Sequence, residues 1–134
     1  MIGIVTDSTC DIPEELVTQY GITIVPQYVI WGEEQFKDRI DLSPLDFYQR
    51  LETDKIRPTT SQASVTDFKQ IFEELSLKGI HEIIVLTISS AMSGTFQMAK
   101  DAAKLVNFPV TVVDTKGPTM TLGWQVLAAA RALE

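Results

Sequence analysis

Short apolar runs alternate along the chain with segments whose apolar residues recur at helical spacing. The runs at residues 2–6, 82–87 and 110–113 predict buried strands. Residues 22–31 are rich in β-branched and aromatic side chains, but Pro26 predicts a bend or an edge position among them. The turn signal that begins at Trp31 predicts a hairpin arm that ends near Lys37.

Helix boundary signals separate these strands. Ser43 and Ser64 are each followed three residues later by an aspartate, which is the pattern of a capped helix start. With the other start and stop signals they predict helices over residues 13–21, 43–51, 64–79 and 91–106, and from Thr119 onward. This alternation favours an α/β fold, with a mostly parallel sheet flanked by helices on both faces. We expect the functional residues beyond the carboxyl ends of its strands.

Length, net charge and cysteine content exclude several classes of function. The 134 residues suit one domain, and 45% of them are apolar, which is enough for a buried core. A net charge of −7 argues against nucleic acid and anionic membranes as partners. No uncharged run is long enough to span a bilayer, no signal peptide is recognisable, and Cys10 has no partner for a disulfide. These features predict a reducing, cytoplasmic setting, where local donors must capture any anionic ligand.

Small hydroxyl side chains gather where the predicted strands end. They occur in residues 6–9, 87–95 and 114–115, and in a predicted loop at residues 58–62. Short donors beside helix starts suit a small anionic head group such as a carboxylate or a phosphate. Ser43, Ser64 and Ser90 have the character of helix caps. Ser93 and Gly94 are predicted just inside a helix, where a glycine costs about 1 kcal/mol and implies a close approach to the backbone.

Other polar residues have simpler interpretations. Asp7 and Asp11 together are candidates for a metal or aspartyl-phosphate site. We expect Asp7 instead to accept hydrogen bonds from loop backbone. Cys10 has no histidine nearby to activate it, and His81 is expected in a surface turn. We expect solvated loop charges at Lys37, Arg39, Lys55 and Arg57.

Several segments, taken in order, closely resemble the motifs of the DegV family. They are Thr6-Asp7-Ser8-Thr9, Thr59-Thr60-Ser61-Gln62, Ser89-Ser90 with Ser93-Gly94-Thr95-Phe96-Gln97, and Val113-Asp114-Thr115 with Leu122-Gly123. The family includes the fatty-acid-binding subunits (FakB type) of bacterial fatty-acid kinase. The resemblance covers the whole chain and implies the EDD-like α/β fold of a DegV N-terminal domain.

The resemblance also implies a function. The chain is expected to bind a long-chain fatty acid, with the carboxylate held by Thr60 and Ser93, and not to be an enzyme by itself. A separate ATP-binding kinase subunit would phosphorylate the carboxylate to an acyl-phosphate. No cofactor, metal ion, nucleic acid or membrane insertion is expected. The expected ligand-binding residues are Thr60, Ser61, Ser93, Gly94, Thr95, Thr6, Ser8, Ser90 and Thr119.

Family members carry a second domain, and the acyl chain lies between the two. Residues 1–134 are therefore expected to be the N-terminal α/β domain, with the C-terminal lipid-binding domain absent from this chain. The apolar residues behind the hydroxyl site would either meet the start of the acyl chain or belong to the ordinary core. They are Leu86, Ile88, Met92 and Phe96.

Two other functions stay open. A small-molecule phosphotransferase or hydrolase, related to dihydroxyacetone-kinase-like domains, would use Ser93 or Asp7, although such enzymes depend on a histidine at the cleft. A protein-interaction module would instead use an exposed Trp31 on the hairpin arm.

Overall fold

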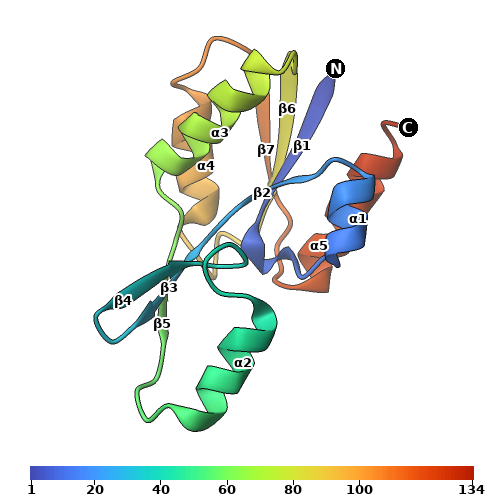
Figure 1. Cartoon of the computed structure of the whole chain (residues 1–134). Helices are drawn as coiled ribbons and strands as arrows, with labels where there is room; N and C mark the ends of the chain where they lie inside the picture. The colour runs from blue at the N-terminus through green and yellow to red at the C-terminus, as the bar shows by residue number, and fades with distance from the viewer.

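The computed structural model describes residues 1–134, and its strands form two separate sheets (Figure 1). The larger sheet is entirely parallel, in the order β2-β1-β6-β7. Its strands are β1 (Ile2–Asp7), β2 (Thr23–Val25), β6 (Glu82–Thr87) and β7 (Val110–Asp114). The smaller sheet is antiparallel, in the order β4-β3-β5. Its strands are β3 (Tyr28–Trp31), β4 (Glu34–Lys37) and β5 (Thr59–Ser61).

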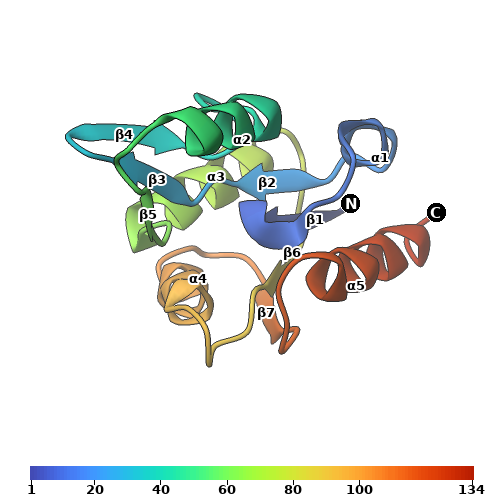
Figure 2. The same ribbon diagram turned by 90° about the horizontal axis from the view of Figure 1, so that it is seen from below.

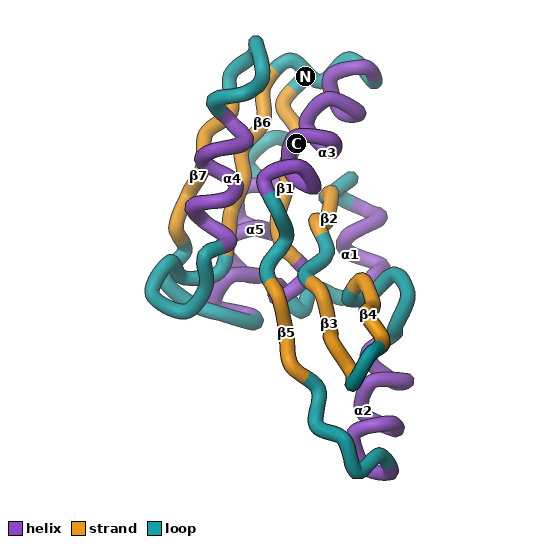
Figure 3. The backbone as a smooth tube through the Cα atoms, turned by 90° about the vertical axis from the view of Figure 1, so that its left-hand side faces the viewer, coloured by secondary structure: helices purple, strands orange, loops and turns teal.

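The helices cover both faces of the parallel sheet, which confirms the predicted fold class. Helices α1 and α5 lie on one face, and α3 and α4 lie on the other (Figure 2). Helix α2 packs against the small sheet, away from the parallel one (Figure 3). The bounds are α1 (Glu14–Gln19), α2 (Pro44–Thr53), α3 (Val65–Leu77), α4 (Thr95–Ala103) and α5 (Met120–Arg131), with a short 3-10 helix η1 (Ser8–Cys10) after β1. None of these helices is long and apolar enough to cross a membrane.

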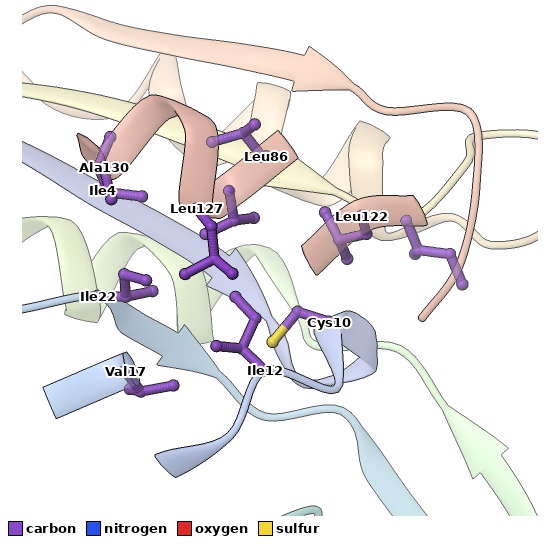
Figure 4. Packing of buried hydrophobic residues seen from close by; sticks show 11 residues of the cluster. Ile4, Cys10, Ile12, Val17, Ile22, Leu86, Leu122, Leu127 and Ala130 are labelled. Atoms are coloured by element: carbon purple, nitrogen blue, oxygen red, sulfur yellow. The ribbon is translucent and has the colours of Figure 1, made fainter. Parts of the chain in front are cut away.

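A buried cluster joins β1 and β6 to the helices α1 and α5. It includes Ile4 of β1, Cys10 of η1 and Leu122 of α5 (Figure 4). Helix α5 approaches η1 so closely that a Cβ built on Gly123 would lie 2.4 Å from the Cys10 carbonyl oxygen. Glycine at this position therefore allows α5 to pack directly against η1, at the end of β1.

Trp31 belongs to the core of the small sheet. Its side chain is 1% exposed and packs with Val29 and Leu42. The indole N–H donates to the Ile56 carbonyl oxygen at 2.9 Å, and the Arg50 guanidinium lies 4.7 Å from the ring centroid. The expectation of an exposed Trp31 is wrong, because alternate side chains of β3 face α2. The hairpin arm itself is confirmed by the pairing of β3 with β4. The hypothesis of a protein-interaction module is weakened, because Trp31 is not available as a contact residue.

Two predicted elements differ from the structure. The predicted loop at residues 58–62 contains β5, whose Thr60 pairs with Val29 of β3. The helix predicted over residues 91–106 begins at Thr95 and ends at Ala103. Serine hydroxyls compete with helix formation by bonding to nearby backbone. Here Ser89 Oγ accepts from the Ala91 N–H at 3.2 Å, and the chain stays in a turn until Gly94.

Two of the predicted helix caps are confirmed. Ser43 Oγ accepts from the Asp46 N–H, and Ser64 Oγ accepts from the Asp67 N–H, each at 3.1 Å. At Ser64 the Asp67 carboxylate also accepts from the Ser64 N–H at 2.8 Å, which completes a capping box. Ser90 is not a cap, because α4 begins five residues later and its hydroxyl bonds elsewhere.

Candidate functional site

Asp7 ties the end of β1 to the end of β6. One carboxylate oxygen accepts from the Thr9 N–H at 2.9 Å and the other from the Ile88 N–H at 2.8 Å. The prediction that Asp7 accepts from loop backbone is therefore confirmed, and both oxygens are occupied within the fold. Beside it Cys10 is fully buried, and burial raises the pKa of its thiol. A protonated, enclosed thiol is a poor nucleophile.

The loops after β5 and β6 meet at Gln62 and Gly94. The Gly94 N–H donates to Gln62 Oε1 at 3.1 Å. A Cβ built on Gly94 would lie 2.5 Å from that oxygen, so glycine is needed for the contact. Gly94 occupies the N-cap position of α4, and not a place inside the helix as predicted. The predicted close approach to the Gly94 backbone is confirmed, but the group that approaches is the Gln62 side chain of this chain.

Ser93 and Thr95 form a pair of hydroxyls beside this contact. Their oxygens lie 2.8 Å apart, and Ser93 Oγ also accepts from the Thr95 N–H at 3.2 Å. Ser93 is partly exposed, whereas Thr95 is fully buried. Thr95 Oγ1 accepts in turn from the side-chain amide of Gln27 at 2.7 Å. Ser93 is therefore the member of the pair that can reach a ligand, and Thr95 supports it from behind.

A cavity of about 710 Å³ opens between the turn after β1, the small sheet and the start of α2. Thr60 and Ser8 contribute to its polar wall, and Val29 and Phe47 to its apolar wall. The Ser8 hydroxyl, 2% exposed, accepts from the Gln27 backbone N–H at 3.0 Å. Ser93 does not line this cavity. The turn that carries Ser93 is instead linked to the strand of Thr60. The Gly94 N–H donates to Gln62, which follows Thr60 by two residues.

One basic side chain, Arg39, lines the cavity together with three acidic ones, Asp11, Glu14 and Asp38. The Arg39 guanidinium is 14% exposed and donates to the Ile12 carbonyl oxygen at 2.8 Å and to Glu14 at 2.9 Å. The expectation of a solvated Arg39 is wrong, because a buried carbonyl and a carboxylate hold its side chain. Burial raises the pKa of the Asp38 carboxyl, although a hydrogen bond from Ser8 and the charge of Arg39 oppose that change.

The remaining candidate residues lie apart from this arrangement. Thr6 is fully buried and its hydroxyl has no hydrogen-bond partner. The Ser90 hydroxyl donates to Asp114 at 2.5 Å, and this bond, with the Lys116 N–H, lowers the pKa of Asp114. Ser61 is exposed on β5. Thr119 is the exposed N-cap of α5, with a left-handed φ of 52°.

The apolar candidates divide between core and surface. Leu86 and Ile88 are buried in the cluster that packs against α5, so they form ordinary core. Met92 is 60% exposed in the turn before α4, and Phe96 is partly exposed on that helix. Only the last two are placed where a ligand can touch them.

Sequence reasoning missed three residues that organise the site. Gln27 is 7% exposed at the crossover from β2 to β3, and Asp38 and Arg39 follow β4. The signal for Gln27 was a polar residue beside Pro26 within an apolar run. No comparable local signal marks Asp38 and Arg39, whose role depends on partners far along the chain.

Comparison with known proteins gives a consistent result. A family model described as an uncharacterised protein of the DegV family matches residues 1–134. A DegV domain-containing protein of Caldanaerobacter subterraneus subsp. tengcongensis is 40% identical over 131 residues, which cover 97% of this chain and 46% of that protein. A fatty acid-binding protein of Thermotoga maritima is 38% identical over 116 residues, covering 85% of this chain and 40% of that protein.

A solved structure agrees with these relatives. A stearic-acid-binding protein from Eubacterium ventriosum superposes with a TM-score of 0.92 and 31% identity, over 99% of this chain and 47% of that one. The chain thus spans about half the length of the proteins that it matches.

Proposed function

Because the chain belongs to the DegV family, we propose that it binds one long-chain fatty acid and holds the carboxylate with neutral donors at Thr60 and Ser93. Relatives named as fatty-acid-binding proteins support the ligand class. One contact carries the assignment of the residues: Gly94 donates to Gln62, which joins the strand of Thr60 to the turn of Ser93. In this proposal Ser8, Gly94 and Thr95 support the two donors from behind, through their bonds to Gln27, Gln62 and Ser93.

The donor chemistry suits a carboxylate. A carboxylate removed from water needs several hydrogen bonds, and hydroxyl and backbone N–H groups supply them. These donors are neutral, so the bound head keeps its negative charge. With a net charge of −7, this chain does not attract the anion from a distance, and its local donors must hold it. Each methylene of the tail that is buried contributes about 0.8 kcal/mol, so the tail supplies most of the affinity.

The proposed role of the protein is to present the acid to another protein. A head group that stays anionic remains a nucleophile, and a separate ATP-binding kinase subunit in the cytoplasm transfers a phosphoryl group to it. The enzyme alternative has less support. Ser93 Oγ bonds only to Thr95, with no base to activate it, and His81 lies before β6, at the opposite end of that strand.

Lipid extraction tests the ligand. The protein containing this chain is purified without added lipid, denatured and extracted, and the extract is analysed by mass spectrometry. We expect about one long-chain acid per protein. Empty protein that also takes up no added acid would contradict the proposal, and release of phosphate from small esters would favour the enzyme alternative. Acyl-phosphate formed with a kinase subunit and ATP is trapped by hydroxylamine as the hydroxamate, which tests presentation separately.

A further inference from the structure

Gln27 connects every segment that carries the proposed head-group site. It lies between β2 and β3, where the chain passes from one sheet to the other, and is 7% exposed. Its backbone N–H donates to Ser8 Oγ at 3.0 Å, and its backbone carbonyl accepts from the Asp38 N–H at 2.9 Å. Its side-chain amide bonds to Ala63, next to Gln62, and to Thr95. One buried residue therefore holds the turn after β1, the end of β4 and the loops before α3 and α4.

The orientation of the Gln27 amide follows from its partners. The Ala63 backbone N–H lies 2.7 Å from Gln27 Oε1 and can only donate. The oxygen of the amide must therefore face Ala63, and the NH₂ group must face Thr95 Oγ1 at 2.7 Å. Since an amide NH₂ can only donate, Thr95 Oγ1 is an acceptor in this bond.

The burial of Thr95 favours one direction for the next bond. Gln27 fills one lone pair of Thr95 Oγ1, and Ser93 Oγ, 2.8 Å away, is the other hydrogen-bond partner of this fully buried hydroxyl. The Thr95 proton is satisfied only if it points to Ser93 Oγ. Ser93 Oγ then accepts from the Thr95 hydroxyl and also from the Thr95 N–H at 3.2 Å. Both lone pairs of Ser93 Oγ are occupied, and the only capacity left is its own proton.

We infer that Gln27 is a positioning residue that directs a chain of hydrogen bonds, from Gln27 to Thr95 to Ser93, and makes Ser93 a donor-only group. This inference rests on the proposed function, and it adds the reason for head-group choice. A carboxylate accepts hydrogen bonds and donates none, so it matches a donor-only hydroxyl. A fatty alcohol can accept the Ser93 proton with its oxygen, but its own proton then finds no lone pair on Ser93, so it fits this site less well than a carboxylate. The direction of the buried hydrogen bonds therefore favours a carboxylate over an alcohol at Ser93.

Gln27→Glu reverses that direction with almost no change in size. One oxygen of the introduced carboxyl group still accepts from Ala63, and above the pKa of that group, which burial raises, the other oxygen has no proton. Thr95 then donates to this second oxygen, Ser93 donates to Thr95, and the free position on Ser93 Oγ becomes a lone pair. Because a hydrogen bond to a charged group is lost, we expect the Kd for a long-chain fatty acid to rise about 10- to 100-fold. We expect the Kd for the fatty alcohol of equal length to change less than about threefold, since the alcohol can donate to Ser93.

The controls separate this effect from added charge and from misfolding. Gln49→Glu adds the same charge at an exposed position of α2 and should leave both Kd values unchanged. In a double-mutant cycle, Gln27→Glu should weaken acid binding much less in the Ser93→Ala background. Equal losses for acid and alcohol, or the same loss in both backgrounds, would assign Gln27 a structural role only.

A lipid-free measurement tests the inference on the wild-type protein. Neutron diffraction from deuterated crystals locates the deuteron between Thr95 Oγ1 and Ser93 Oγ. We expect it on Thr95, and a deuteron on Ser93 that points to Thr95 would overturn the inference, whatever the protein binds. If the deuteron lies on Thr95 and the protein binds no fatty acid, the proposed function is wrong and the chain of hydrogen bonds stands.

Discussion

The side chain of Gln62 lies directly against the backbone of Gly94, where its Oε1 accepts the Gly94 N–H at 3.1 Å and leaves no room for a Cβ. This contact joins two motifs that are 32 residues apart in the sequence. It explains why a glycine occupies the N-cap of α4 although its backbone conformation, with φ of −76°, does not require one.

Gly94→Ala should separate the two loops. The new Cβ displaces the flexible Gln62 side chain, so the loss of stability is expected to stay near 1–2 kcal/mol, the value of one hydrogen bond and a changed cap. Fatty-acid affinity should fall more than stability. Gln62→Ala removes the same hydrogen bond without a clash, so adding Gly94→Ala to it should have little further effect. Additive losses in chemical denaturation and in binding would contradict this interpretation of the contact.

Thr60→Val and Ser93→Ala should each weaken the binding of a long-chain acid. The loss of a donor to a charged head group corresponds to about a 10- to 100-fold rise in Kd. Neither hydroxyl is fully buried, so the free energy of unfolding should change by about 1 kcal/mol or less. Thr59→Val is the matched control, because Thr59 is equally exposed on β5 but faces away from the cavity. Loss of folding in either variant would instead give that residue a structural role.

Gly123→Ala should destabilise the fold although alanine is the better helix former. The added Cβ would lie 2.4 Å from the Cys10 carbonyl oxygen, and a backbone atom cannot swing aside. Overpacking of this kind costs about 1–3 kcal/mol. Ala128→Gly, at an exposed position of α5, should cost about 1 kcal/mol and so show that the helix itself prefers alanine. Urea denaturation of both variants tests this, and a gain in stability for Gly123→Ala would exclude the tight approach of α5 to η1.

Arg39 should matter more than the carboxylate to which it is paired. Its Nη2 donates to the buried Ile12 carbonyl at 2.8 Å as well as to Glu14. Arg39→Met keeps the aliphatic stem and should cost about 1.5–3 kcal/mol, because that carbonyl loses a charged donor. Glu14 is 74% exposed, so Glu14→Gln should cost less than about 1 kcal/mol. Equal losses from the two variants in thermal denaturation would show that the ion pair, and not the buried carbonyl, gives Arg39 its value.

Asp38 should make stability depend on pH. Burial raises the pKa of its carboxyl above the ordinary value of 3.8, so in that range the native state binds more protons than the unfolded state. The free energy of unfolding attributable to Asp38 therefore falls as the pH rises from 3.8 through the native pKa, and is constant above it. Asp38→Asn should remove this dependence. Glu33→Gln, in the exposed β3–β4 turn, should retain it in urea denaturation at a series of pH values.

The local pattern of the sequence was sufficient for the parallel sheet and for two helix starts. Residues 82–87 form β6 as predicted, because a strand covered by helices on both faces has a continuous apolar run, here Ile83 to Leu86. Ser43 and Ser64 cap their helices because each cap involves residues only three apart. The order of the hydroxyl motifs likewise indicated the family, which the comparison with known proteins confirmed.

The tertiary structure alone decided how these motifs meet. Gln27 bonds to Ser8, Ala63 and Thr95, which lie 19, 36 and 68 residues away, and no local pattern specifies partners at such distances. The same holds for Arg39. Its charge predicted an exposed side chain, but in the fold the turn before α1 covers that side chain and the Ile12 carbonyl oxygen accepts from it. A strand or a cap is fixed by its neighbours in the sequence, whereas the direction of a buried hydrogen bond is fixed by whichever donors and acceptors the folded chain brings to it.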